Sequence, residues 1–131
     1  MIYAWFKYAK DDLMVATTLH KINHLDMYRG ITFNCQQVIE KSIKGLLAYN
    51  KIKFDKIHDI KVLSHSLILV YPDLEDILKR SDKLTKYAVE FRYPESIDKP
   101  ISTDEVLDCI EIAKLFFKLA CDKIPFESTL F

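Results

Sequence analysis

Glycine and proline are scarce in this chain of 131 residues, which contains two glycines and four prolines. Both residue types favour tight turns, and glycine also allows bulges in strands. A chain with so few of them has little means of making the many turns of an all-β fold. The composition therefore favours long helices joined by a small number of connections.

Cysteine is scarce too, and long apolar runs are missing. The three cysteines lack the paired spacing of a zinc or redox site, so we expect free thiols in a reducing cytoplasm, with no metal and no catalytic residue among them. No apolar run approaches the roughly 20 residues of a membrane-spanning helix, and charges interrupt the amino terminus too often for a signal peptide. We therefore expect a cytoplasmic protein that does not enter a membrane.

The charge balance is neutral overall but uneven along the chain. Half of the residues are hydrophobic and 29% are charged, which suits a single globular domain over residues 1–131. Residues 1–65 carry 10 Lys or Arg against 6 Asp or Glu, whereas residues 66–131 carry 9 against 13. The neutral total argues against a nucleic-acid-coating protein. The positive excess between Lys41 and Lys61 still leaves room for a local phosphate site.

Apolar residues recur at spacings of three and four along most of the chain, as in helices with one buried side. The pattern predicts a first helix over residues 2–24, a second over 32–49 and a third over 59–70. A fourth follows and ends near Arg92, and the last begins at Ser102. We therefore predict an all-α fold, an antiparallel bundle of four long helices plus one short helix.

Short polar residues mark the expected helix starts. Asp59 is placed to cap the third helix, and Asp73 to cap the short one. Ser102 and Glu105 have the spacing of a capping box at the start of the last helix.

Three further positions are expected to shape the connections and the packing. Arg29–Gly30 is the expected turn between the first two helices, and the stretch from Pro94 to Ser102 is the longest expected loop. Gly45 lies inside the second helix, where glycine is unfavourable, and so indicates a close approach by another helix.

The last helix is apolar over more than one side, because it carries additional large residues beside its inward stripe. These are Leu107, Cys109, Ile112, Leu115, Phe116 and Leu119. A helix apolar over most of its circumference is buried on more than one side, which predicts a homodimer. An aromatic-rich core of a monomer is the other interpretation.

Four polar residues share the side of the second helix that lies opposite its apolar stripe. They are Gln37, Glu40, Lys41 and Lys44. Such a stripe is either a solvated helix face, with Glu40 and Lys44 as a surface ion pair, or the floor of a polar groove that receives a ligand.

An ordered set of motifs resembles the HEPN family of small prokaryotic helical domains over nearly the whole chain. The set begins with the amino-terminal stretch YAKDDLMVA and continues through Gln36, Gln37, Glu40, Lys41 and Lys44. It then includes His58–Asp59 and Arg92–Tyr93–Pro94, and closes with a helical carboxy terminus.

The resemblance implies a helical bundle that dimerises and is often encoded beside a minimal nucleotidyltransferase, in toxin–antitoxin or nucleotide-handling pairs. HEPN ribonucleases share an arginine followed four to six residues later by a histidine. Neither Arg92 nor Arg29 nor Arg80 has a histidine at that distance. We therefore expect a member that is not itself catalytic.

The expected ligand is ATP, another nucleotide or RNA, with no resident cofactor. Arg92 would grip a phosphate, Lys41 and Lys44 would add positive charge, and Tyr93 would stack on a base. Gln37 would bond a base or sugar edge. Glu40 and His58 complete the expected site, and we expect all of these groups to form one charged pocket.

Structural roles are open for the same residues. Glu40 can pair with Arg92 or Lys44, and His58–Asp59 can be no more than a helix start. A structural or regulatory homodimer that holds a protein partner is the alternative function, and a divergent ribonuclease using His58 or His65 is a remote one.

Overall fold

The computed structural model describes residues 2–93 and 99–125, and within these ranges the chain is helical with no strand. Its helices are α1 (Ile2–Ile22), α2 (Tyr28–Tyr49), α3 (Ile60–Val70), α4 (Glu75–Ser81), α5 (Thr85–Arg92) and α6 (Thr103–Cys121). Three short 3₁₀ segments, Leu25–Met27, Pro72–Leu74 and Asp82–Leu84, join some of them. The predicted all-α bundle is confirmed.

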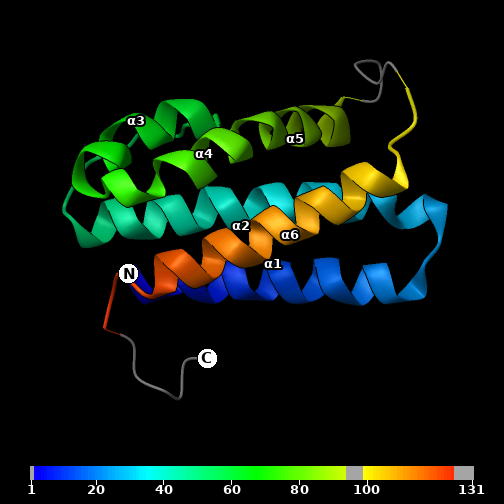
Figure 1. Cartoon of the computed structure of the whole chain (residues 1–131), viewed down its shortest axis with the longest axis horizontal. Helices are drawn as coiled ribbons and strands as arrows, with labels where there is room; N and C mark the ends of the chain where they lie inside the picture. The colour runs from blue at the N-terminus through cyan, green and yellow to red at the C-terminus, as the bar shows by residue number, and fades with distance from the viewer. Residues whose placement is uncertain (1, 94–98, 126–131) are drawn as a thin grey trace.

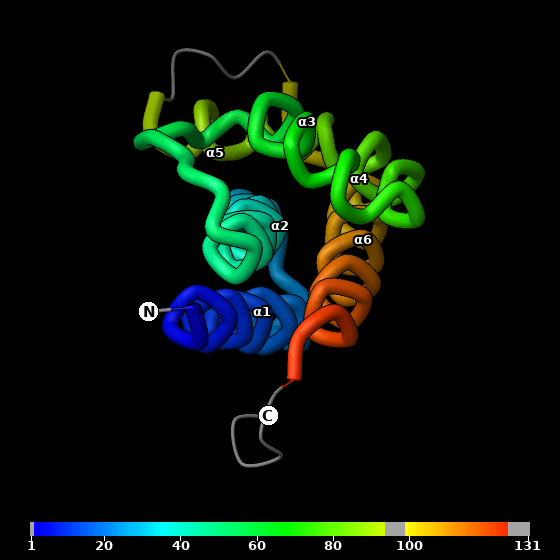
Figure 2. Tube along the Cα trace, turned by 90° about the vertical axis from the view of Figure 1, so that its left-hand side faces the viewer, coloured from blue at the N-terminus to red at the C-terminus, as the bar shows by residue number. Residues whose placement is uncertain are grey.

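Helix α2 lies at the centre of the bundle. It runs antiparallel to α1, while α6 crosses in front of both and α3, α4 and α5 form a layer above (Figure 1). The view along the bundle shows α2 with α1 below it, α6 on its right and the α3–α5 layer above it (Figure 2). Fourteen of the 22 residues of α2 are buried, so this helix supplies much of the core.

Two of the predicted caps are confirmed. The Asp59 carboxylate accepts hydrogen bonds from the backbone N–H groups of Lys61 and Val62, at 2.9 and 3.3 Å, and so begins α3. Ser102 and Glu105 form the reciprocal capping box at the start of α6. Both depend on residues within one helical turn, which is why the sequence predicts them.

The expected turn at Arg29–Gly30 is wrong, because α2 already begins at Tyr28. The chain instead reverses near Asn23, which adopts a left-handed conformation with φ of 54°. Asparagine tolerates that conformation better than most residues. Gly30 is helical and lies against Leu19 of α1.

The expected cap at Asp73 is also wrong. Helix α4 begins after Leu74 without a side-chain cap, and the Asp73 carboxylate pairs with Lys123 beyond the end of α6. The hydrogen bond from Lys123 lowers the pKa of Asp73. Of the expected loop from Pro94 to Ser102, residues 94–98 lie outside the described residues.

The surplus apolar residues of α6 are mostly used by the core. Cys109, Ile112 and Phe116 are buried, whereas Leu107 and Leu115 stay exposed. Over the part of the chain that the structure describes, no helix combines the length and apolar character needed to cross a membrane.

The cysteines are free thiols, as expected. Cys35 and Cys109 are buried, and Cys121 is half-buried. Burial raises the pKa of Cys109 to about 11 and that of Cys121 to about 12. The thiols are therefore protonated at neutral pH, and none is an activated nucleophile.

Gly45 marks the predicted close approach, and its replacement tests how rigid that contact is. A Cβ atom at Gly45 would lie 2.4 Å from the Phe6 ring of α1, and Phe6 is fully buried. We expect Gly45→Ala to lower the free energy of unfolding by about 1–3 kcal/mol, because the ring has no room to move. Urea denaturation followed by circular dichroism measures the change.

Gly30→Ala is the matched control. Its Cβ would lie 3.2 Å from the flexible end of Leu19, which is half-buried, and alanine favours the helix by up to about 1 kcal/mol. We expect this variant to be neutral or slightly stabilised. An equal loss in both variants would show that the Gly45 contact is not special.

Candidate functional site

A buried carboxylate, Glu40, is the centre of a polar cluster inside α2. Its side chain is 4% exposed. Its Oε1 accepts a hydrogen bond from Gln36 Nε2 at 3.0 Å, and its Oε2 accepts one from Lys44 Nζ at 3.0 Å. His58 Nδ1 lies 3.1 Å from the same Oε2. The spacing of four residues places Gln36, Glu40 and Lys44 on one side of the helix.

His58 is the member of this cluster that reaches solvent. It immediately precedes the cap Asp59, and its backbone carbonyl accepts a long hydrogen bond of 3.4 Å from Gln36 Nε2. In the neutral tautomer that donates from Nδ1 to the Glu40 carboxylate, Nε2 is left as an acceptor. The His58 side chain is 52% exposed, so an oriented imidazole stands at the surface.

Aromatic rings cover the Lys44 ammonium, whose side chain is 6% exposed. Its Nζ lies 5.6 Å from the centre of the Trp5 ring and 5.9 Å from that of the Phe54 ring. The two rings meet edge to face with centres 5.8 Å apart. Trp5 comes from α1 and Phe54 from the α2–α3 connection, so two different segments of the chain enclose this charge.

Lys41 and Gln37 lie further round the same helix. Lys41 Nζ donates to Asp12 Oδ2 of α1 at 2.6 Å, and both side chains are mostly buried. Burial raises the pKa of Asp12, while the hydrogen bond and charge of Lys41 act in the opposite direction. Gln37 Nε2 donates to Gln36 Oε1 at 2.6 Å, which links Gln37 to the Glu40 cluster.

One strip of α2 stays partly exposed between Thr32 and Ala48. It comprises Phe33, Asn34, Gln37, Lys41 and Ala48. At 100° per residue these positions fall within an arc of about 100°. Figure 2 shows α1, α6 and the α3–α5 layer around the other sides of the helix. The exposed strip is therefore the part of α2 that solvent reaches between Thr32 and Ala48.

Arg92 and Tyr93 lie at the end of α5 and are exposed. The preceding Phe91 stacks on Phe33 in α2, with ring centres 4.1 Å apart. Arg29 Nη2 donates to the carbonyl oxygens of Glu90 and Phe91, at 3.0 and 3.1 Å. These contacts fasten the end of α5 to the first turns of α2.

A pocket of about 390 Å³ lies beside these contacts between α5 and α2. Arg29 and Tyr28 from α2 and Lys99 from the segment before α6 line it, together with Leu25, Asp26, Pro100 and Ile101. The Tyr28 hydroxyl is 2.9 Å from Thr103 Oγ1, so α6 also supports this end. Two cations and one carboxylate, Asp26, line this concave site, so its charge is positive by one and favours an anionic group.

The expected single pocket is replaced by two separate sites. Gln37, Glu40, Lys44 and His58 form one cluster, and Lys41 pairs with α1 beside it. Arg92 and Tyr93 lie near the first turns of α2, because the adjacent Phe91 stacks on Phe33. Phe33 and Lys44 are separated by about 16 Å along the helix. The pair of Glu40 with Arg92 that the sequence left open is not formed, because Lys44 and His58 occupy the carboxylate.

The sequence also suggested that Glu40 and Lys44 are solvated or line an open groove, and both interpretations are wrong for these two residues. Their burial depends on Trp5 and Phe54, which lie in other segments. Asp12, Phe33 and Phe91 were missed as parts of the site. The sequence held one indication of the Phe33–Phe91 pair: Phe91 lies directly before Arg92, which was itself a predicted site residue.

Metal ligands do not gather in the described residues, where no three His, Cys, Asp or Glu side chains come together in a way that could hold an ion. The cluster around Glu40 is therefore described by hydrogen bonds and charge alone.

Removing one charge of the buried pair should cost more than removing both. In Glu40→Gln the Lys44 ammonium loses its anion, and we expect the free energy of unfolding to fall by about 3–5 kcal/mol. In Lys44→Met the carboxylate keeps Gln36 and His58, and we expect a loss of about 1–3 kcal/mol. The double variant should recover to within about 2 kcal/mol of the wild type.

Urea denaturation of the four proteins measures this double-mutant cycle. Losses that simply add in the double variant would contradict the coupling of the two charges.

Comparisons with known proteins bear on the whole chain. The family model described as HEPN domain matches residues 2–124. The crystal structure of ST0689, an archaeal HEPN homologue, is similar to this structure with a TM-score of 0.73 and 26% sequence identity, over 95% of this chain and 98% of that one. No curated protein matches the sequence. Because the family model spans nearly all of the chain, this protein belongs to the HEPN domain family.

Proposed function

We propose that this HEPN domain binds a nucleotide or RNA along the exposed strip of α2 and does not itself catalyse a reaction. The observation that supports this most is the imidazole of His58, which buried Glu40 orients at the surface beside that strip. Holding a partly exposed side chain by a buried carboxylate restricts its motion, so less entropy is lost when a ligand binds.

Neighbouring parts of the strip suit different parts of such a ligand. At one end, Arg92 and the pocket with Arg29 and Lys99 supply cations for phosphate. There the ring of Tyr93, which is 55% exposed, is the group proposed to stack on a base. One helical turn further along the strip, Gln37 offers hydrogen bonds to a sugar or base edge, and so does His58 beside the strip.

The proposed setting is the cytoplasm, with a minimal nucleotidyltransferase as protein partner, in a toxin–antitoxin or nucleotide-handling pair. The resemblance of the motif set to such HEPN proteins supports the partner. The three free thiols fit a reducing compartment.

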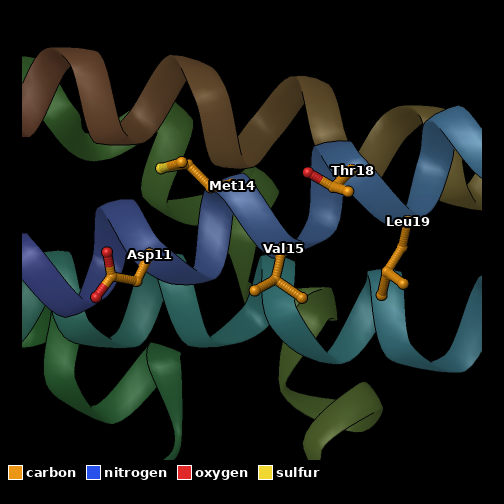
Figure 3. A pocket seen from close by; sticks show the side chains of 5 residues that line it. All are labelled: Asp11, Met14, Val15, Thr18 and Leu19. Atoms are coloured by element: carbon orange, nitrogen blue, oxygen red, sulfur yellow. The ribbon is translucent and has the colours of Figure 1, made fainter.

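A second candidate function is a homodimeric interaction module, and the exposed side of α1 favours it. Met14 and Ile22 are each 57% exposed, Tyr8 is 55% exposed and Val15 is 44% exposed. A shallow hollow of about 430 Å³ lies among Asp11, Met14, Val15, Thr18 and Leu19 (Figure 3). Four large apolar side chains exposed on one helix, together with the hollow, favour an interaction site.

The α1 surface is suited to pairing with a second copy of itself. In an antiparallel pair of α1 helices centred between Met14 and Val15, Asp11 of one protomer faces Thr18 of the partner subunit, and the converse. A carboxylate then accepts a hydrogen bond from a hydroxyl at each end of an apolar centre. Such two-fold pairing is the usual geometry of homodimers.

The nucleotide proposal is tested by calorimetric titration of ATP and of a short single-stranded RNA into the wild type and Arg92→Ala. We expect heat with the wild type and at least about tenfold weaker binding in Arg92→Ala, because a phosphate contact is lost. His58→Ala should weaken binding too, whereas Lys118→Ala on α6 should not.

Negligible heat with both the wild type and Arg92→Ala would remove the proposal. Gel analysis of mixed cellular RNA incubated with the wild type and His58→Ala checks the ribonuclease alternative. Cleavage that disappears in His58→Ala would show that the protein is an enzyme.

Light scattering at micromolar concentration tests the dimer. We expect twice the monomer mass for the wild type, and the monomer mass for Val15→Asp, because a buried charge at the centre of the α1 pair is unpaired. Leu107→Asp on α6 is the matched control and should stay dimeric. A monomeric wild type would contradict the dimer, and dissociation only in Leu107→Asp would move the interface to α6.

A further inference from the structure

The connection between α2 and α3 is basic, and neither the core nor the proposed ligand site uses its charges. Lys51, Lys53 and Lys56 are all exposed. Within residues 2–93 and 99–125, no carboxylate forms an ion pair with any of these three lysines. The exposed Asp55 lies between Lys53 and Lys56 and offsets one of the three charges, while Asp59 at the start of α3 is engaged as its cap. The connection therefore presents a net positive edge.

A hollow of about 180 Å³ with a mixed, mainly apolar lining includes Lys53 of this edge. Leu47, Ile52, Phe54 and Ile57 line it from α2 and the connection, and Val62, Leu63 and Ser66 line it from α3, with Lys53 at its rim. Its lining is mainly aliphatic, so it suits an aliphatic side chain better than a polar group.

The outer side of α3 extends this apolar surface away from the hollow. Val62 is 48% exposed, Val70 is 41% exposed and Leu69 is 84% exposed. Val62, Ser66, Leu69 and Val70 have the spacing of neighbours on one helix face. The hollow and this face together form one surface, which we call the α3 groove, with lysines along one side.

We propose that the α3 groove docks an acidic amphipathic helix of a partner protein. Apolar side chains of that helix fill the hollow and lie along Val62 and Leu69, while its carboxylates face Lys51, Lys53 and Lys56. This is helix-in-groove recognition, in which spaced apolar anchors give the affinity and the charges at the rim speed and select the encounter.

The chemistry of the groove favours a peptide over a nucleic acid. Base recognition on such a surface needs an exposed aromatic face. The Phe54 ring meets Trp5 edge to face and lies 5.9 Å from the Lys44 ammonium, so it already has its partners. The remaining hollow residues are aliphatic apart from Ser66 and Lys53.

This inference does not depend on nucleotide binding, since it uses neither Arg92 nor the exposed strip of α2. Its test is fluorescence anisotropy with labelled helical peptides of about 16 residues. The first peptide carries leucine at positions i, i+3, i+4 and i+7 and glutamate beside them. In the second every glutamate is lysine, and in the third every leucine is serine.

We expect the acidic leucine peptide to bind the full chain with micromolar affinity, and the other two at least about tenfold more weakly. Binding of the first should weaken between about 50 and about 300 mM salt, because exposed charges are screened. Lys53→Glu/Lys56→Glu should weaken it at least about tenfold, and so should Val62→Ser/Leu69→Ser.

Lys114→Glu/Lys118→Glu, which makes the same charge change on exposed positions of α6, is the matched control and should bind normally. Circular dichroism confirms that each variant is folded. The proposal would be overturned if the anisotropy of the acidic leucine peptide did not change at a protein concentration of about 100 μM, which is about 100 times a micromolar dissociation constant.

Two further outcomes would also overturn it. One is equal binding by the serine peptide, which would mean attraction by charge alone. The other combines two results: oligouridine displaces the acidic peptide completely from the wild type, and oligouridine still binds the Val62→Ser/Leu69→Ser variant. Together these results would assign the lysines to nucleic acid instead.

Discussion

The carboxylate of Glu40, buried within the central helix, is the constraint on which the centre of this bundle depends. A buried charge is costly unless donors surround it, and Glu40 has three: Lys44 and Gln36 from its own helix and His58 from the connection. Because Lys44 is buried by Trp5 and Phe54, satisfying one charge fixes α1, α2 and the α2–α3 connection against one another.

Features that depend on neighbouring residues could be predicted from the sequence. The cap at Asp59, the capping box at Ser102 and the close approach at Gly45 follow from a few adjacent positions, and the motif set identified the family correctly. The turn near Asn23 was missed because Gly30 is the more usual signal. The burial of Lys44 was missed because its cover comes from distant segments, and no local pattern reports such a cover.

The sequence correctly grouped only those members of the candidate site that lie on the same side of one helix. Gln37, Glu40 and Lys44 do belong together, and His58 joins them through a contact that spacing along the chain does not encode. Arg92 was assigned to the same place because it ends a helix that packs on α2. The register of that packing, set by Phe33 against Phe91, places the end of α5 near the first turns of α2, about 16 Å of helix from Lys44. Apolar patterns in the sequence indicate which helices pack together, but they do not indicate the axial register of one helix against another.

The three-sided enclosure of α2 has a consequence for how this sequence can vary. A helix that packs apolar groups towards three neighbours and carries an ion pair in its interior tolerates few replacements over most of its circumference. Freedom to diverge is then concentrated in Asn34, Gln37 and Ala48, because Phe33 stacks on Phe91 and Lys41 pairs with Asp12. Specificity among related domains would accordingly change at those three positions while the scaffold beneath stays the same.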